Sequence, residues 1–248
     1  MLETYISEIF TVFNDIKATV IIFGPELISA TNAAQDVFAI QYAEQIITKM
    51  PFTSMCTRDR ISEFNNRIKQ WDDVVMDFKT TNGEVMEVVF SSKKSKAKIN
   101  FKCMKKSVIM GAERSFQDVS LNVAREIPPK RLKVDPEFKL IMDASEIATL
   151  SDGNRMMKSE FVTINSDKGK AEVILTSDNG ERMNIDIDVP VIQVGSKDST
   201  FSYRYRADNF LNLVKRYGTD GIVLCSHGVV RMQTPHVAIY IAPIKNVV

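Results

Sequence analysis

The chain has 248 residues, of which 44% are hydrophobic and 25% are charged, and its formal net charge is only +1. This composition excludes disordered, collagen-like and low-complexity classes, and the length allows one large domain or two of ordinary size. The three cysteines, Cys56, Cys103 and Cys225, are far apart and in no metal-ligand spacing, which favours a reducing intracellular compartment.

Four segments predict amphipathic helices, because apolar residues recur in them at three- and four-residue intervals. They cover residues 2–17, 57–71, 143–152 and 206–218, and Gly218 is expected to end the last one. The segments between them alternate with period two, which predicts antiparallel strands. We expect a hairpin over 73–90 that turns at Asn82-Gly83, three strands over 161–189 and two or three over 220–243.

The order of these elements predicts a duplicated α+β fold. Each half runs helix, strands, helix, strands, so two similar domains are expected at residues 1–119 and 137–248. The segment 120–136 between them, with Pro128, Pro129 and Pro136 in or beside it, is expected to be an extended connector without regular pairing. A long surface loop within one domain is the alternative.

The sequence contains no convincing catalytic or metal-binding group. His227 and His236 are expected in turns, and Cys225 near His227 has no third group to orient a dyad. Asp186 and Asp188 share one strand face, but two carboxylates do not define a metal site. There is no phosphate-binding or dinucleotide-binding glycine loop, and Trp71 is expected in the core. We predict no catalytic residue, metal or cofactor; a small enzyme with an unrecognised site remains open.

The beginning of the chain has an acid and no basic segment, so we expect no signal peptide and no secretion. The apolar runs are too short to predict a membrane span.

Residues 201–244 carry the clearest family pattern. FSYRYR is followed by a helix that begins at Ala207-Asp208, an alternating hairpin, and a last strand that ends Tyr240-Ile241-Ala242-Pro243. Together with the order of elements along the chain, and with residues 32–43 in the place of a loop and strand under a partner pocket, this resembles the DNA sliding clamps of the proliferating-cell-nuclear-antigen and phage type. The first half resembles them in element order alone.

The resemblance implies two clamp domains per chain, each with two helices packed on antiparallel sheets, and a closed ring of three chains. Such a ring encircles duplex DNA without reading its sequence, tethers the replicative polymerase and carries out no reaction. The implied partners are double-stranded DNA, a DNA polymerase, a clamp loader and further copies of the chain. The implied location is inside the cell, in the cytoplasm or in the nucleus of a eukaryotic host. A non-enzymatic β-rich viral structural or assembly protein is the alternative.

A clamp needs diffuse positive charge that faces phosphates. The candidates on or beside the predicted helices are Lys17, Arg58, Arg60, Arg67, Lys69, Arg155, Lys158, Lys215 and Arg216. The first helix departs from this pattern, since it carries Glu3, Glu8 and Asp15 against one lysine. A solvated helix face is the alternative for each cation.

The resemblance also implies an apolar pocket for partner peptides, under the connector and beside the C-terminal segment. Carried onto this chain, its residues are Val37, Ala39, Leu121, Val123, Ile127, Tyr240, Ala242 and Pro243. The end of the sequence, IKNVV, is apolar, unlike the acidic tails of some clamps.

Residues 93–106, KKSKAKINFKCMKK, hold seven lysines and alternate between cationic and apolar positions, which predicts a strand with one face of each kind. The resemblance implies that it is an edge strand, paired with the strand 181–189 of a neighbouring chain. The expected interface residues are Lys96, Lys98, Ile99, Phe101, Lys102, Met183, Ile185, Asp186 and Asp188. Contact of the lysines with DNA or a loader at the outer surface remains open.

Overall fold

The computed structural model describes residues 2–24, 28–41, 51, 53–57, 60–104, 116–118, 123–124, 132–134, 136–167, 170–187, 192–193 and 200–244. The chain divides into two compact units. Unit 1 contains Met1–Ser115, Glu126–Lys130 and Pro235–Ala238, and unit 2 contains Phe116–Arg125, Arg131–Thr234 and Ile239–Val248. The predicted domain boundaries stay a prediction.

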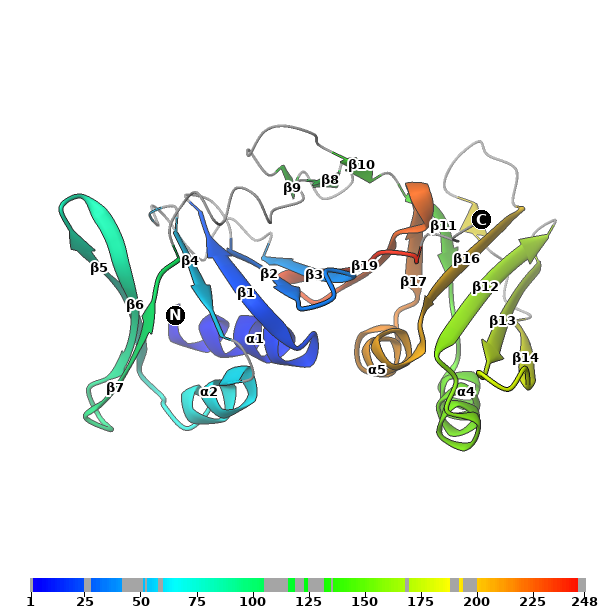
Figure 1. The fold of residues 1–248 in the computed structure, drawn as a ribbon, viewed down its shortest axis with the longest axis horizontal. Helices are drawn as coiled ribbons and strands as arrows, with labels where there is room; N and C mark the ends of the chain where they lie inside the picture. Colours follow the sequence, from blue (N-terminus) through cyan, green and yellow to red (C-terminus); the bar gives the residue numbers. More distant parts are fainter. Residues whose placement is uncertain are drawn as a thin grey trace. The chain divides into compact units, whose positions relative to one another are not determined.

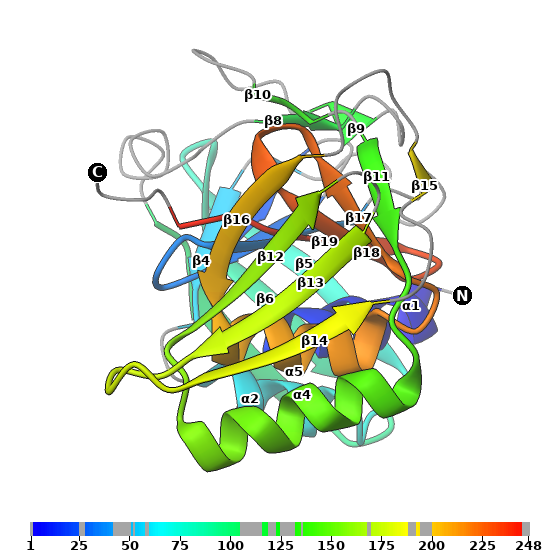
Figure 2. The ribbon, with the colours of Figure 1, turned by 90° about the vertical axis from the view of Figure 1, so that its right-hand side faces the viewer.

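Figures 1 and 2 label the elements. Those in the first part of the chain are α1 (Leu2–Asp15), β1 (Ala18–Phe23), β2 (Ile28–Asn32), β3 (Val37–Gln41), β4 (Thr53–Cys56), α2 (Ile61–Ile68), β5 (Val74–Thr81), β6 (Glu84–Ser92), β7 (Ala97–Lys102), β8 (Phe116–Asp118), β9 (Val123–Ala124) and β10 (Leu132–Val134). Those that follow are β11 (Pro136–Leu140), α4 (Ala144–Met157), β12 (Phe161–Asp167), β13 (Lys170–Thr176), β14 (Arg182–Ile187), β15 (Ile192–Gln193), β16 (Phe201–Arg206), α5 (Ala207–Tyr217), β17 (Ile222–Cys225), a 3-10 turn (Ser226–Gly228), β18 (Val230–Gln233) and β19 (Val237–Ile241). The predicted order of helix, strands, helix, strands in each half is confirmed.

Unit 1 packs two helices against two sets of strands. Its strands run in the orders β3-β2-β1-β4 and β5-β6-β7, and α1 packs against α2. Phe10 of α1, Phe64 of α2, and Phe90 and Phe101 of β6 and β7 form one aromatic cluster. The centroids of their contacting rings lie 4.7 to 6.2 Å apart in edge-to-face geometry, which stabilises the cluster beyond the burial of its area.

Unit 2 repeats this plan with α4, α5 and the sheet β14-β13-β12-β16, which Figure 2 shows from its outer face with α4 along one end. A second row of strands runs β15-β11-β17-β18. Asp143 and Glu146 form a reciprocal capping box that begins α4, with both hydrogen bonds 2.7 Å long. Because α4 ends at Met157, this helix is longer than the predicted 143–152.

Several turns confirm the sequence signals. Asn82 and Gly83 both have positive φ (53° and 80°), as the two central residues of a tight hairpin turn between β5 and β6 require. Gly180 (φ 85°) lies in the turn before β14, and Trp71 is buried as expected.

The expectation of a connector without regular pairing is wrong for the part that the structure describes. β8 pairs in parallel with β10 and antiparallel with β9, so short strands do occur there. Pro136 begins β11 and lies opposite Cys225 of β17. A proline is tolerated at the first position of a strand, and sequence patterns alone do not show which strand end it occupies.

Replacing Phe90 by alanine should lower the free energy of unfolding by about 3–5 kcal/mol, because its fully buried ring contacts three other rings of the cluster. Urea unfolding followed by circular dichroism measures this loss. Phe161, a half-exposed residue under Arg204 on the outer sheet face, is the matched control. Phe161→Ala should lose less than half as much; an equal loss would contradict the central role of the cluster.

Tyr205 should make stability sensitive to alkaline pH. Its hydroxyl donates a 2.7 Å hydrogen bond to the carbonyl of Gly228, and burial raises the pKa of Tyr205 well above its ordinary value of 10.0. The unfolded chain therefore releases this proton at a lower pH than the folded one, so stability is lost as the pH rises above the ordinary tyrosine range.

Tyr205→Phe should cost about 1–3 kcal/mol at pH 7, because it leaves a buried carbonyl without its donor. Above pH 10 the variant should lose stability less steeply than the parent chain. Urea titrations at pH 7 and at pH 10.5 test this, and parallel losses in the two proteins would show that Tyr205 titrates normally.

Candidate nucleic-acid interface and assembly edges

The predicted basic residues in the described ranges are all exposed: Lys17, Arg60, Arg67, Lys69, Arg155, Lys158, Lys215 and Arg216. Arg58 lies outside these ranges. Lys17 follows the end of α1, and Lys158, with φ 52°, occupies the left-handed position that ends α4. These positions at helix ends present the cations to solvent instead of packing them into the core.

The cations of α4 and α5 lie in different positions along their helices. Arg155 lies 3.2 Å from Asp152, one turn earlier on α4, so its charge is partly neutralised. On α5, Lys215 and Arg216 both lie in the last turn, where cations also interact favourably with the helix dipole. Glu8 of α1 lies 3.7 Å from His236, which gives an acidic residue of α1 a partner within unit 1.

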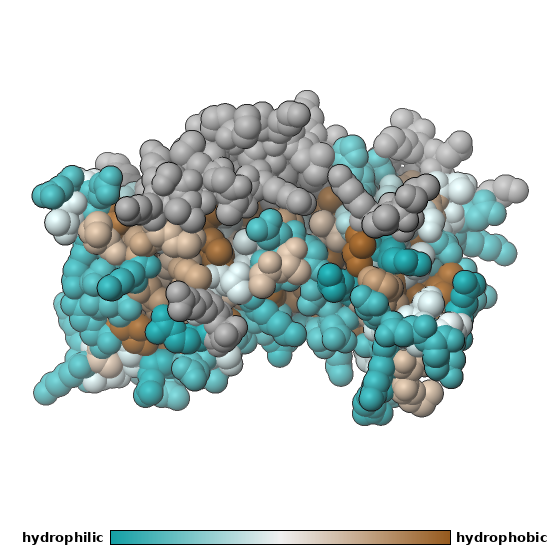
Figure 3. Space-filling model, in the orientation of Figure 1, coloured by the Kyte–Doolittle hydropathy of each residue, from teal (hydrophilic) through white to brown (hydrophobic). Residues whose placement is uncertain are grey.

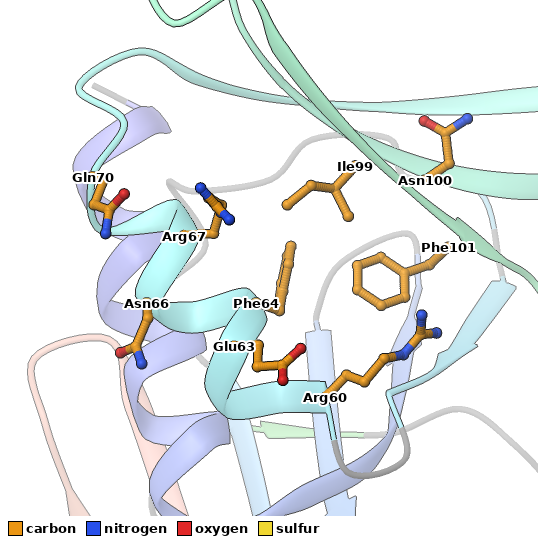
Figure 4. Close-up of a pocket in the computed structure, with 9 residues that line it drawn as sticks. All are labelled: Arg60, Glu63, Phe64, Asn66, Arg67, Gln70, Ile99, Asn100 and Phe101. Atoms are coloured by element: carbon orange, nitrogen blue, oxygen red, sulfur yellow. The ribbon is translucent and has the colours of Figure 1, made fainter.

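A pocket of about 470 Å³ lies between α2 and β7. Figure 4 shows Phe64 from the helix and Ile99 and Phe101 from the strand pointing toward one another at its base. Figure 3 shows small hydrophobic patches among hydrophilic side chains on the face of the molecule that it presents.

The rim of this pocket is charged. Arg60 stacks 5.7 Å from the centre of the Phe101 ring, and Arg67 and Glu63 lie along the same side of α2. Two of the predicted DNA contacts are therefore placed beside β7. The pocket was not predicted from the sequence. The spacing of Arg60, Glu63 and Arg67, which places them on one helix face, was the signal that could have indicated its rim.

β7 is an outer strand of its three-stranded sheet, as predicted. It begins at Ala97, so Lys94 and Lys96 are not on the strand as expected. They belong to a turn that Asp73 holds through bonds from the backbone N–H groups of Lys93 and Lys94 (2.8 and 2.9 Å). A hydrogen bond from the Ser92 hydroxyl, followed by those backbone bonds, lowers the pKa of Asp73.

The two faces of β7 differ as the alternation predicts. Lys98 and Lys102 are exposed on one face, whereas Ile99 is half-buried and Phe101 buried on the other. Lys102 lies opposite Glu87 of β6, and Lys98 lies opposite Ser91. Of the two lysines on β7, Lys98 therefore has no acidic residue directly opposite it on β6.

β14 is likewise an outer strand, and it begins at Arg182. Met183 and Ile185 lie half-buried on the helix side. Gly153 of α4 packs closely on Met183, because a Cβ at position 153 would lie only 2.1 Å from the Met183 sulfur. On the outer face Asp186 lies directly opposite Glu172 of β13. Adjacent like charges on one face destabilise a sheet, so a cation at this edge would be favourable. Asp188 lies outside the described residues.

The predicted partner-pocket residues do not all reach the surface. Val37, Ala39 and Tyr240 are no more than 1% exposed, whereas Ala242 and Pro243 are half-exposed. Val37 and Ala39 belong to unit 1, and Tyr240, Ala242 and Pro243 to unit 2. Leu121 and Ile127 lie outside the described residues, as does the side chain of Val123.

The described residues do not form the dyad considered at Cys225 and His227. Cys225 is buried, and His227 is an exposed residue of the 3-10 turn with φ 62°. His236 is half-buried, with its ring 4.3 Å from that of Tyr5. In the same ranges, no group of three or more histidine, cysteine, aspartate or glutamate side chains is placed to hold a metal ion. No helix in the described part is long and apolar enough to span a membrane.

No protein-family model and no curated protein matches the sequence. Similar solved structures include the Helicobacter pylori beta clamp bound to a DNA ligase peptide (10% identity, TM-score 0.61) and the PCNA2–PCNA3 complex of Sulfolobus tokodaii (16%, 0.55). Another is the PCNA of A. fulgidus bound to the C-terminal region of FEN-1 (15%, 0.55).

These likenesses cover 98%, 98% and 96% of this chain, respectively. The chain spans only 65% of the Helicobacter pylori clamp, but 96% and 95% of the two PCNA chains. All three similar structures are sliding clamps. The chain therefore has the sliding-clamp fold, as its element order indicated.

Proposed function

We propose that this protein is a DNA sliding clamp. Three copies close into a ring that encircles double-stranded DNA and tethers a DNA polymerase, and a clamp loader places the ring on DNA inside the cell. The observation that carries the proposal is the sliding-clamp fold over 96% to 98% of the chain. In this role the protein catalyses no reaction and needs no cofactor. The alternative of a β-rich viral structural protein has no similar support.

Exposed cations on the helices would face the phosphates in this ring. Lys215 and Arg216 in the last turn of α5, and Arg67 and Lys69 at the end of α2, are the proposed contacts, because all four side chains are exposed. Contacts to phosphates supply affinity without sequence preference. A ring can then move along the duplex while remaining linked to it.

The edges β7 and β14 would join neighbouring copies. Pairing them would extend both sheets and satisfy backbone groups that an outer strand leaves open. An antiparallel register with Lys98 opposite Asp186 also sets Ile99 opposite Ile185 and Phe101 opposite Met183. Lys98 would then relieve the repulsion between Asp186 and Glu172, while the apolar faces on the helix side would cover one another.

The pocket between α2 and β7 would lie beside this seam. Met156, near the end of α4, is 78% exposed, the largest exposure among the large hydrophobic side chains of the described residues. Since α4 packs on β13 and β14, the neighbour's β14 would bring Met156 toward the apolar base formed by Phe64, Ile99 and Phe101. Burial at such a pocket supplies affinity, whereas the exposed ion pairs chiefly fix the register.

Partner proteins would dock short peptides near the C-terminal segment. Two of the similar clamps bind such segments, a DNA ligase peptide and the C-terminal region of FEN-1. Ala242 and Pro243 are the described residues of this proposed site with accessible side chains. Val37, Ala39 and Tyr240 are buried, so their side chains would not touch a docked peptide.

Loaded protein should remain on closed circular DNA and leave the same DNA after linearisation, because a ring is held by topology. Gel filtration of loaded complexes measures the retained fraction. In the variant Lys215→Glu/Arg216→Glu, loading should fall several-fold, and the salt slope of DNA association should decrease by about 1 for each phosphate that the variant no longer neutralises.

Lys170→Glu/Arg204→Glu, which changes two exposed cations on β13 and β16 outside the helices, is the control of equal charge and should load normally. Equal retention on circular and linear DNA would contradict encirclement. Equal losses in both variants would contradict a specific role of α5.

Reversing the charge of Lys98 should weaken the association between copies, and the compensating change should restore it. We expect Lys98→Glu to raise the dissociation constant of the assembly about 3- to 10-fold, because it places three acids together at the seam. Lys98→Glu/Asp186→Lys should recover most of the loss. Sedimentation velocity over a dilution series measures both.

Lys69→Glu is the control away from β7 and β14 and should assemble as the parent chain does. If Lys98→Glu assembles normally but loads poorly on DNA, the lysine strand contacts DNA or the loader and the proposed seam is wrong. If Asp186→Lys does not rescue Lys98→Glu, the proposed register is wrong.

A further inference from the structure

β5 is the outer strand on the side of the β5-β6-β7 sheet opposite to β7. It is eight residues long, and Val75 is 43% exposed on it. Met76 and Phe78 on its other face are only half-buried. Among the described residues no strand pairs with this edge. Long outer strands with exposed apolar side chains are prone to pair with another chain, so this edge needs an explanation.

Two hydrogen bonds show which backbone groups face outward. The N–H of Cys103, just beyond β7, bonds to the Met86 carbonyl (2.9 Å), so even-numbered residues of β6 face β7 and odd-numbered ones face β5. Asp77 lies opposite Val89 of β6 and shares a bonded pair with it, whereas Met76 and Phe78 direct their backbone groups away from the sheet. Accordingly, the Phe78 N–H donates to the Asp77 carboxylate (2.8 Å) instead of to β6.

Unit 2 contains the same arrangement with its edge occupied. β17 follows α5 as β5 follows α2, and each is the first strand of its hairpin. β17 pairs with β18 on one side and with β11 on the other. Phe138 of β11 lies opposite Leu224 and Leu140 lies opposite Ile222, and all four side chains are buried.

The two strands correspond residue by residue from their first positions. Val74 corresponds to Ile222, and both are buried. Met76 corresponds to Leu224, whose backbone also faces outward, toward β11. Leu224 is 1% exposed under its partner strand, whereas Met76 is half-exposed. Unit 1 therefore presents the surface that β11 covers in unit 2.

We propose that the β5 edge is a docking site for an extended segment of a partner protein. The segment adds as an antiparallel strand, bonds to the outward backbone groups of Met76, and places apolar side chains at alternate positions toward the helix side. β11, with the sequence PEFKL, shows the pattern of apolar and charged residues that such an occupant needs. Main-chain bonds supply affinity in this mode of recognition and the alternating side chains supply specificity.

Asp77 sets a limit on this docking. Its carboxylate occupies the outward N–H of Phe78, so a docked strand that extends past Met76 must displace it. A carboxylate at this position also opposes uncontrolled pairing of the edge with other chains. Asp77→Ala should therefore bind the same segment more tightly than the parent chain.

The test uses a synthetic peptide that copies residues 136–141 (PEFKLI), acetylated and amidated, with the full-length protein. Hydrogen exchange followed by mass spectrometry should show saturable protection over residues 74–79. The strand segments 97–102 and 182–187 should not change. A control peptide with serine in place of phenylalanine and leucine should protect nothing.

Met76→Pro tests the backbone bond. It removes an outward N–H that β6 does not use, a position where an outer strand tolerates proline. The peptide should bind this variant at least about tenfold more weakly, while the mass of the assembly and its retention on circular DNA stay unchanged. If Met76→Pro fails to fold, a series of peptides, each methylated at one backbone nitrogen, gives the same test with the unaltered protein.

Absence of protection at 74–79, or equal binding by the serine peptide or by Met76→Pro, would overturn the proposal. If residues 74–79 become more protected as the protein concentration rises in the absence of peptide, the edge binds a second copy of the chain and the proposed partner segment is wrong. The proposal does not depend on the ring, so failure of the ring experiments and failure of this one can be distinguished.

Discussion

The main constraint on this structure is the way its sheets end. A strand with a neighbour on one side only leaves every second N–H and C=O without a partner, and it covers only part of its apolar face. β7 and β14 both end their sheets, and both carry half-buried aliphatic residues, Ile99 and Ile185, toward the helices. The fold of one chain is therefore complete in its centre and open at these edges, and in the proposed ring pairing between copies would complete it.

The distribution of charge agrees with this role of the edges. Lys102 faces Glu87 within its own sheet, whereas Lys98 faces Ser91. On β14 the carboxylates of Asp186 and Glu172 lie opposite each other. One edge thus offers a cation and the other offers excess negative charge. In the proposed ring these complementary charges would face each other across the seam, while the net charge of the chain stays close to zero.

The helix periodicity and the Asn82-Gly83 turn could be predicted from the sequence, because each depends on local spacing or local backbone chemistry. The edge position of the lysine strand, residues 93–106, was predicted only through the resemblance to sliding clamps. The residue at which the lysine strand begins could not be predicted. Lys94 and Lys96 fit the alternation, but Asp73, 21 residues before Lys94, holds that segment as a turn. The burial of Val37, Ala39 and Tyr240 was also missed, because alternation does not show that both faces of a strand are covered. The pocket between α2 and β7 depends on packing between distant segments.

The mass of the purified protein in solution tests the central claim most directly. Static light scattering coupled to gel filtration should give three times the chain mass of 28.0 kDa, stable over a wide range of protein concentrations. Closed rings of three identical chains have this discrete mass because the β7 and β14 edges of each chain are occupied by its neighbours. A mass of one chain at all concentrations, or particles that grow with concentration, would contradict the proposed ring.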